Sequence, residues 1–263
     1  MSFYEQGFEN RLYLKSNLFD NNIITHCFTT KCGGVSKGDI NGLNLGFRVN
    51  DNEASVRENY RLIACDMELD LNKAVLSKQT HTDNIRIISK DDFGKGIMRT
   101  SDIEDTDGLV TNIEGAALVV FSADCTPVLL FDPIQKVAAA VHSGWRGSVK
   151  KIAPKCVELM ETEFGSNLHD ILVAIGPCIG QCCFEFGNDA TNYFDANYLK
   201  PSGNDKYMVD LRLYISDSLI SVGIDKNNID ICDACTMCNT DKFYSYRANK
   251  DKTGRQAAII MIK

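Results

Sequence analysis

Two histidines and one cysteine occur in sequence contexts that suit a shared metal ion. In chain order, the three residues lie in the motifs Gln79-Thr-His81-Thr-Asp83, Ala123-Asp-Cys125-Thr-Pro127 and Val141-His142-Ser-Gly-Trp-Arg-Gly147. Two imidazoles and one thiolate suit Zn²⁺, and three protein ligands leave a fourth position open for water or substrate. Copper also accepts such a ligand set. We therefore predict a catalytic metal centre at His81, Cys125 and His142, with Zn²⁺ as its metal.

Charged residues beside these ligands suggest further roles in catalysis. Asp83 and Asp124 are predicted catalytic carboxylates, which would orient an imidazole or a bound water or carry protons. Arg146 follows His142 within a Gly-rich turn in which an anion could dock. A purely structural role for this turn is the alternative, with Trp145 packed and Arg146 paired with an acid.

The remaining cysteines raise the question of a second site. The chain has eleven cysteines, an odd number, and its first residues lack the features of a signal peptide, so a reducing compartment is expected. The segment Cys232-Asp-Ala-Cys235-Thr-Met-Cys238 has metal-ligand spacing, and Cys178-Ile-Gly-Gln-Cys182-Cys183 is the nearest source of a further ligand. A structural zinc site built from both segments is an alternative to packing, which we expect for most of these thiols.

The overall charge and hydropathy exclude some classes of function. A formal charge of -7 and a pI near 5.2 argue against a protein that follows a nucleic-acid backbone. No segment approaches roughly 18 uninterrupted apolar residues, the length that a membrane-spanning helix needs. We therefore expect a cytoplasmic protein with small-molecule partners and no membrane or nucleic-acid partner.

Short β-branched or aromatic runs bounded by turn residues predict many strands. The expected strands are Arg11–Leu14, Ile23–Thr29, Ile85–Ile88, Ala117–Ser122, Val128–Phe131, Val137–Val141, Ile171–Ile175, Phe243–Tyr246 and Ala257–Ile262. The three metal motifs fall at or just after the ends of strand-like runs, where a rigid scaffold holds exposed polar groups.

Helical periodicity is weaker and predicts fewer elements. The expected helices are Ala54–Leu69, Val149–Phe164, Leu211–Val222 and a shorter one over Asp189–Tyr198. Pro154 must lie in the first turn of its helix or kink it. Because strands outnumber helices and do not alternate regularly with them, we expect an α+β fold, a mixed sandwich, rather than a doubly wound sheet. The chain shows no repeat and no linker, so residues 1–263 are predicted to form a single domain.

Eight motifs, read together and in order, resemble those of one known family. They are Phe28-Thr-Thr-Lys-Cys-Gly-Gly-Val-Ser36, Gln79-Thr-His81, Ala123-Asp-Cys-Thr-Pro127, Val141-His-Ser-Gly-Trp-Arg-Gly147, Gly176-Pro-Cys-Ile-Gly180, Cys235-Thr236, Phe243-Tyr-Ser-Tyr-Arg247 and Thr253-Gly-Arg255. The chain resembles the YfiH/YlmD (laccase-domain, polyphenol oxidase-like) family of purine nucleoside phosphorylases from about Ile23 to Ile262.

The resemblance implies a four-layer α/β/β/α sandwich and a metal bound by His81, Cys125 and His142. It also implies phosphorolysis of inosine, adenosine and 5'-methylthioadenosine to free base and (methylthio)ribose 1-phosphate, with adenosine deamination as a second activity. An older family name implies copper-dependent phenol oxidation, but four histidines are too few for linked copper centres.

A phosphorylase must also hold an anion, and we expect Lys31, Arg48 or Arg146 to do so. Lys31 departs from the family pattern, in which Arg is usual, and lysine lacks the bidentate fork of arginine. Two alternatives remain to phosphorolysis. One is a metal-independent hydrolase with Cys125 as nucleophile and a histidine as base. The other is a copper-binding or redox-sensing module without nucleoside turnover.

Overall fold

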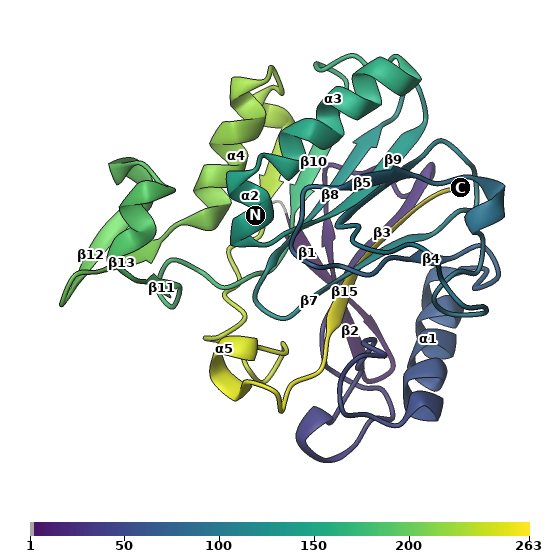
Figure 1. The fold of residues 1–263 in the computed structure, drawn as a ribbon. Helices are drawn as coiled ribbons and strands as arrows, with labels where there is room; N and C mark the ends of the chain where they lie inside the picture. Colours follow the sequence, from purple (N-terminus) through teal and green to yellow (C-terminus); the bar gives the residue numbers. More distant parts are fainter. Residues whose placement is uncertain (1–2) are drawn as a thin grey trace.

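Two six-stranded sheets packed face to face form the centre of the structure, a computed structural model that describes residues 3–263 (Figure 1). The first sheet contains strands from both ends of the chain, because the last strand, β15 (Gln256–Ile262), pairs antiparallel with β3 (Ile24–Thr29) and β7 (Leu118–Ser122). Its strands in spatial order are β1 (Phe3–Phe8), β2 (Arg11–Ser16), β3 (Ile24–Thr29), β15 (Gln256–Ile262), β7 (Leu118–Ser122) and β4 (Val75–Leu76).

The second sheet contains the hairpin that carries two of the candidate ligands. Its strands in spatial order are β14 (Ile229–Ile231), β10 (Leu172–Ile175), β8 (Thr126–Asp132), β9 (Val137–Ser143), β6 (Gly108–Thr111) and β5 (Ile85–Ile87). Strands β8 and β9 form a tight hairpin, at whose turn the Asp132 carboxylate accepts the N–H groups of Ile134 and Gln135. Such a turn fixes the strand register.

Residues 3–263 also form five α-helices and five short 3₁₀ helices. The α-helices are α1 (Glu53–Met67), α2 (Trp145–Val149), α3 (Ile152–Phe164), α4 (Leu211–Ser221) and α5 (Tyr246–Asn249). The 3₁₀ helices are η1 (Gly38–Ile40), η2 (Lys90–Asp92), η3 (Asn188–Asn192), η4 (Ala196–Tyr198) and η5 (Lys226–Asn228).

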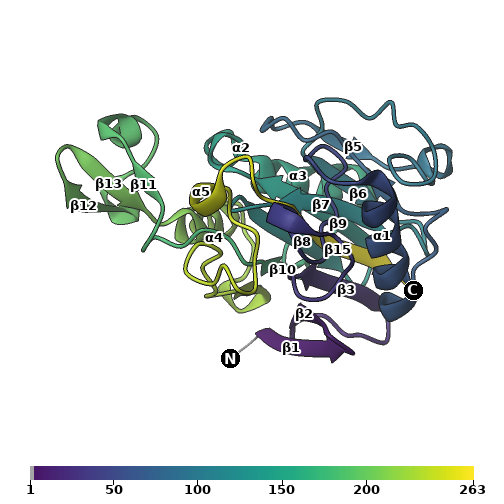
Figure 2. The same cartoon turned by 90° about the horizontal axis from the view of Figure 1, so that it is seen from below.

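Alternation of side chains along the strands explains the layers. In β7, Val120 belongs to the apolar cluster between the sheets, whereas Val119 belongs to the cluster that includes Tyr60 and Ile63 of α1. In β8, the central cluster takes Leu129, and its neighbours in the strand face the cluster that contains α3 and α4. Strands with both faces buried are expected between helical layers. The fold is therefore the expected α+β sandwich, with helices outside both sheets (Figure 2).

A small third sheet projects from the side of this body (Figures 1 and 2). It consists of β11 (Glu185–Phe186), β13 (Lys206–Val209) and β12 (Leu199–Gly203), in that spatial order. The sequence patterns did not predict it. Every position of β12 after Leu199 is exposed, so the strand has little of the apolar alternation by which strands are recognised.

Most predicted elements are confirmed, but three differ. The Phe243–Tyr246 strand is wrong, because a side chain takes the place of a strand partner: Gln256 accepts the N–H of Tyr244 and donates to its carbonyl. The predicted Val149–Phe164 helix is divided into α2 and α3 by Lys151, which has a φ of 63°. The Asp189–Tyr198 helix consists instead of η3 and η4.

No helix within residues 3–263 is both long and apolar enough to cross a membrane.

Candidate metal centre and active site

His81, Cys125 and His142 come together at one end of the two sheets. One potential ligand atom from each lies within 4.8 Å of the others. Cys125 Sγ is 3.7 Å from His81 Nε2, and the two imidazole rings meet edge to face with centroids 5.0 Å apart. These spacings suit three ligands on one cation with bond lengths of about 2.0–2.3 Å.

The hairpin register explains how Cys125 and His142 meet. Pro127 of β8 pairs with His142 of β9, so the residues just before β8 lie beside His142. Cys125 lies in the tight turn between β7 and β8, where Asp124 has a φ of 88°. The turn crosses from one sheet to the other, and it places the thiol just before the first residue of β8, at the end of the sheets.

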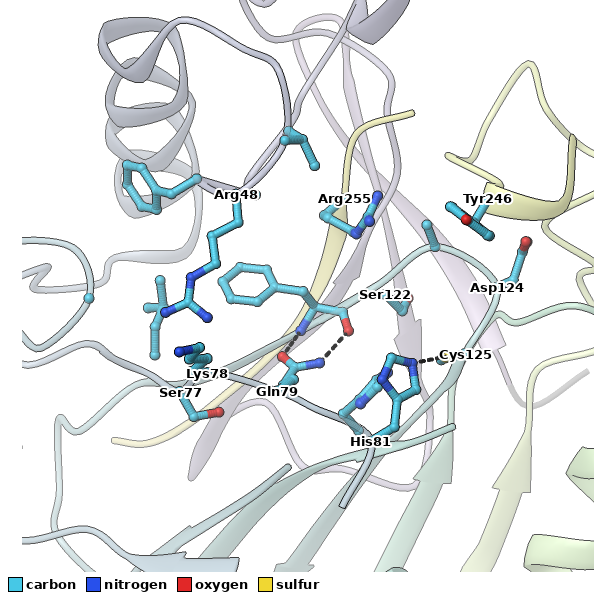
Figure 3. A pocket seen from close by; sticks show the side chains of 18 of the residues that line it. Arg48, Ser77, Lys78, Gln79, His81, Ser122, Asp124, Cys125, Tyr246 and Arg255 are labelled. Atoms are coloured by element: carbon cyan, nitrogen blue, oxygen red, sulfur yellow. Dashed lines mark hydrogen bonds between the residues drawn. The ribbon is translucent and has the colours of Figure 1, made fainter. Parts of the chain in front are cut away.

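Gln79 fixes the loop that carries His81. Its side-chain amide donates to the Phe121 carbonyl at 2.8 Å, and its oxygen accepts the Phe121 N–H at 2.7 Å (Figure 3). Strand β4 pairs with β7 at Leu118 and Val119, and the Gln79 side chain bonds to the β7 backbone two residues further along. The Gln79-Thr-His81 motif thereby joins a ligand to the group that positions it.

Asp107 is the residue that positions both histidines, and the sequence patterns did not single it out. Its Oδ1 lies 2.7 Å from His142 Nδ1, and its two oxygens accept the successive N–H groups of Thr80, His81 and Thr82. A carboxylate on Nδ1 leaves Nε2 of His142 as the ligand atom. By accepting these three N–H groups, Asp107 holds His81 in a left-handed conformation with a φ of 64°.

Gly144 tests whether a metal fits among these side chains. A Cβ at this position would lie 3.0 Å from His81 Cδ2, 3.1 Å from Cys125 Sγ and 3.6 Å from His142 Cε1. The absence of a side chain therefore leaves open the space that all three donors share. Donor chemistry and available space both fit a Zn²⁺ ion.

The charged groups at the centre shift one another's pKa values. Burial would raise the pKa of Cys125, but the positive charge of His142 and hydrogen bonds from both histidines lower it from 9.0 to about 6. Burial would raise the pKa of Asp107 too, but its bond to His142 lowers it to about 2. Burial lowers the pKa of His142, yet Cys125 and Asp107 raise it to about 9. Cys125 is therefore a thiolate at neutral pH, the form that binds metals.

A cavity of about 1020 Å³ opens onto this centre. Its lining includes aromatic side chains from several elements, namely Phe47, Phe121, Trp145, Phe184 and Tyr246. It also includes six cationic side chains and two carboxylates, namely Arg48, Arg57, Lys78, Arg99, Arg247 and Arg255 with Glu53 and Asp124. A chain with a formal charge of -7 thus surrounds this cavity with cations, which favours an anionic ligand.

Arg48 and Arg255 are the cations best placed to bind such an anion. Figure 3 shows both across the cavity from His81. Within residues 3–263 the Arg48 guanidinium has no hydrogen bond or ion pair, and the Arg255 guanidinium donates only to the carbonyls of Thr253 and Gly254. Arg57, by contrast, is bound to Glu53 and to a backbone carbonyl.

Of the two predicted carboxylates, the structure places only Asp124 at the cavity. Asp124 is buried, and its two oxygens accept the Thr236 hydroxyl and the Arg247 N–H, each at 2.6 Å. Asp83 does not line the cavity, because its carboxylate forms ion pairs with Lys150 and Lys155. The carboxylate that hydrogen-bonds to a candidate ligand's imidazole is therefore that of Asp107.

Of the three predicted anion partners, only Arg48 lines the cavity. The Arg146 guanidinium lies over the Trp145 ring, 4.3 Å from its centroid, on the solvent side of α2. Trp145 also packs edge to face against Phe186, as the structural alternative for this turn expects, but within residues 3–263 Arg146 has no ion pair with an acid. Lys31 also lies outside the cavity lining, in a segment whose backbone pairs with Lys242 and Leu43.

Comparisons with known proteins give one family over nearly the whole chain. A family model described as "Multi-copper polyphenol oxidoreductase laccase" matches residues 25–263. "Purine nucleoside phosphorylase YlmD" of Bacillus subtilis (strain 168) is 32% identical over 246 residues, which cover 90% of this chain and 87% of the relative.

Solved structures agree with this result. The crystal structure of YlmD from Geobacillus stearothermophilus has a TM-score of 0.92 at 29% identity, covering 99% of this chain and 98% of that one. The crystal structure of Bacillus licheniformis hypothetical protein YfiH has a TM-score of 0.91 at 30% identity, covering 98% and 99% respectively. The chain therefore belongs to the YfiH/YlmD family, whose family model is described as multi-copper polyphenol oxidoreductase laccase.

Proposed function

We propose that this protein is a purine nucleoside phosphorylase that cleaves inosine, adenosine and 5'-methylthioadenosine with phosphate. One observation carries the proposal: a single cavity combines the His81, Cys125 and His142 trio with cations that have no acidic partner and with several aromatic side chains. The names of the curated relatives support the same reaction class.

Phosphorolysis requires that phosphate reach the ribose C1' as the base leaves. A phosphate oxygen forms the new bond to C1', the C1'–N bond breaks, and the departing base takes up a proton. Arg48 and Arg255 would hold the phosphate by charge-assisted hydrogen bonds and keep it near the sugar. The aromatic walls, including Phe121 and Tyr246, offer faces for the purine ring.

His81, Cys125 and His142 would hold the metal, which we propose to be Zn²⁺. Bound there, Zn²⁺ would supply a Lewis acid that stabilises negative charge. Asp107 keeps the two histidines in place. Asp124 anchors the turn before Cys125 to Thr236 and to the backbone of Arg247, so its main role is to position the thiol and one cavity wall.

The test is to incubate purified protein with each nucleoside, with and without phosphate, and to separate free base and ribose 1-phosphate by chromatography. We expect phosphate-dependent release of base that is lost in Cys125→Ala and on complete chelation. Adenosine deamination, the second proposed activity, would use water in place of phosphate, so ammonia release without phosphate measures it. No turnover of any nucleoside by the zinc-loaded wild type would overturn the proposal.

A second candidate function rests on a specific arrangement. Cys125, His142 and Asp107 form a chain of thiolate, imidazolium and carboxylate like that of cysteine hydrolases. This candidate predicts activity that survives complete chelation and is abolished by iodoacetamide. Loss of activity on chelation with recovery on adding zinc would favour the phosphorylase instead.

A further inference from the structure

Four cysteines outside the cavity converge from two distant segments of the chain. Cys182 and Cys183 precede β11, and Cys235 and Cys238 follow β14. One sulfur from each lies within 4.8 Å of the others, and Cys238 Sγ is 3.6 Å from Cys182 Sγ and 3.4 Å from Cys183 Sγ. All four are free thiols.

These separations match the geometry of a tetrathiolate metal site. Four sulfurs placed tetrahedrally at about 2.3 Å from a Zn²⁺ ion are about 3.8 Å from one another. The two Cys238 contacts are close to that value, and the 4.8 Å limit on the other separations leaves at most about 1 Å for closure onto the ion.

Apolar packing does not account for the cluster. Free cysteines that act as small hydrophobes are usually buried, yet Cys182 and Cys238 are exposed and Cys183 is half-buried. A disulfide would join two sulfurs at about 2.05 Å and would leave the other two unexplained. Convergence of all four favours one shared ligand.

The surroundings of Cys235 suit a metal-bound thiolate. Its Sγ accepts the backbone N–H of Gly180 at 3.2 Å, the kind of bond that orients a thiolate ligand. Gly180 also leaves room for the cluster, because a Cβ there would lie 3.3 Å from Cys182 Sγ and 3.2 Å from Cys235 Cβ.

We propose that Cys182, Cys183, Cys235 and Cys238 bind one Zn²⁺ ion as a closed, structural site. Four protein sulfurs complete the tetrahedron and leave no position for a substrate. The cation would join the start of the small third sheet to the loop after β14, two segments that are more than 50 residues apart in the sequence.

The site would brace the wall of the cavity. Thr236, next to Cys235, donates to Asp124, and the Arg247 guanidinium donates to the carbonyls of Cys183 and Glu185. Asp124 and Arg247 both line the cavity. Removal of the cation would loosen these supports without removing any group that faces a substrate.

The test measures zinc per chain by elemental analysis, after purification under reducing conditions and removal of loosely bound metal. Cys238→Ser and Cys183→Ser each remove one proposed ligand. Cys65→Ser is the matched control, because Cys65 is an exposed free thiol on α1. His81→Ala removes a ligand of the other centre only. We expect Cys238→Ser and Cys183→Ser to hold one equivalent fewer than wild type and Cys65→Ser to match wild type.

The His81→Ala variant separates this proposal from the proposed function. If the catalytic centre does not take zinc, wild type and His81→Ala both hold one equivalent and Cys238→Ser holds none. Substitution with Co²⁺ gives a second readout, since thiolate-to-cobalt charge-transfer absorption should persist in His81→Ala and largely disappear in Cys238→Ser. Equal zinc in wild type and Cys238→Ser, or a native mass two hydrogens lower from a disulfide among these cysteines, would overturn the proposal.

Discussion

The Asp107 carboxylate bonds to the ring of His142 at 2.7 Å and to the backbone N–H of His81 at 3.0 Å. One side chain therefore sets the ring orientation of one candidate ligand and the backbone conformation of another. Asp107 is also fully buried, so no water can replace it without rearrangement.

Replacement of Asp107 by Asn should weaken the metal centre more than it weakens the fold. Outer partners of ligating histidines are typically worth 10- to 100-fold in metal affinity or activity, and we expect a loss in that range for Asp107→Asn. Competition for Zn²⁺ with a chromophoric chelator measures the affinity. Asp83→Asn is the comparison, because Asp83 pairs with lysines outside the cavity; an equal loss in both variants would contradict the assignment.

A methyl group at Gly144 should displace the ligands. The added Cβ would lie 3.0–3.1 Å from His81 and Cys125 atoms, and small displacements of reacting groups can cost about 100-fold. We expect Gly144→Ala to lose at least about tenfold in kcat/KM for nucleosides. The control is Gly7→Ala, where the nearest atom is 3.9 Å away. Unchanged kcat/KM in Gly144→Ala would show that the site does not need this space.

Arg48 should set the affinity for phosphate. A lost hydrogen bond between charged groups costs about 1.5–3 kcal/mol, or roughly 10- to 100-fold, and we expect the KM for phosphate to rise by that factor in Arg48→Ala. Arg48→Lys should recover only part of it, because lysine lacks the planar fork. Arg146→Ala, on the solvent-exposed face of α2, should change this KM by less than about threefold, since exposed charges contribute little. A larger effect in Arg146→Ala than in Arg48→Ala would assign the anion site to Arg146, another of the three cations suggested by the sequence.

Buried His26 should make the fold sensitive to acid. Burial and the nearby charge of Lys15 lower its pKa from 6.5 to about 3. Between these values the unfolded chain binds a proton that the folded chain does not, so the free energy of unfolding falls as the pH falls. The slope from this residue reaches about 1.4 kcal/mol per pH unit. Above pH 6.5, His26 is neutral in both the folded and the unfolded chain, so it no longer lowers the free energy of unfolding.

Urea unfolding at a series of pH values from 7.5 to 4.5 measures this slope. His26→Gln keeps an acceptor for the Ser16 N–H, which His26 Nε2 accepts at 2.9 Å, and its unfolding free energy should depend less on pH than that of wild type. His169→Gln, an exposed position, should leave the wild-type slope unchanged. Parallel pH curves for wild type and His26→Gln would exclude His26 as the source.

The candidate ligands could be predicted from the sequence because their chemistry is local. A His or Cys at the end of a strand-like run, beside Asp or Gly, carries its signal within a few residues. Asp107 carries no such signal, because it follows His81 by 26 residues and is defined by the bonds that it accepts. The only available clue was a polar Asp-Thr-Asp107-Gly segment directly before an apolar run.

The fold follows a similar division. Strands whose backbone groups pair in a ladder gave clear patterns. Phe243–Tyr246 has the aromatic composition of a strand, but the Gln256 side chain, not a neighbouring strand, bonds to its backbone at Tyr244. The cysteine cluster depends on β10 and β14 pairing as parallel neighbours, which brings the two segments together. Neither cysteine segment has a periodic sequence pattern from which this contact could be predicted.

The projecting three-stranded sheet offers a practical attachment point. Its outermost turn, at Gly203, Asn204 and Asp205, consists of three successive exposed residues with φ of 86°, 49° and 54°. Exposed loop tips of this kind tolerate inserted sequence better than other positions. A short epitope or a fluorescent label placed there would extend away from both sheets of the main body (Figure 2), so the protein could be immobilised or imaged with its cavity facing free solution.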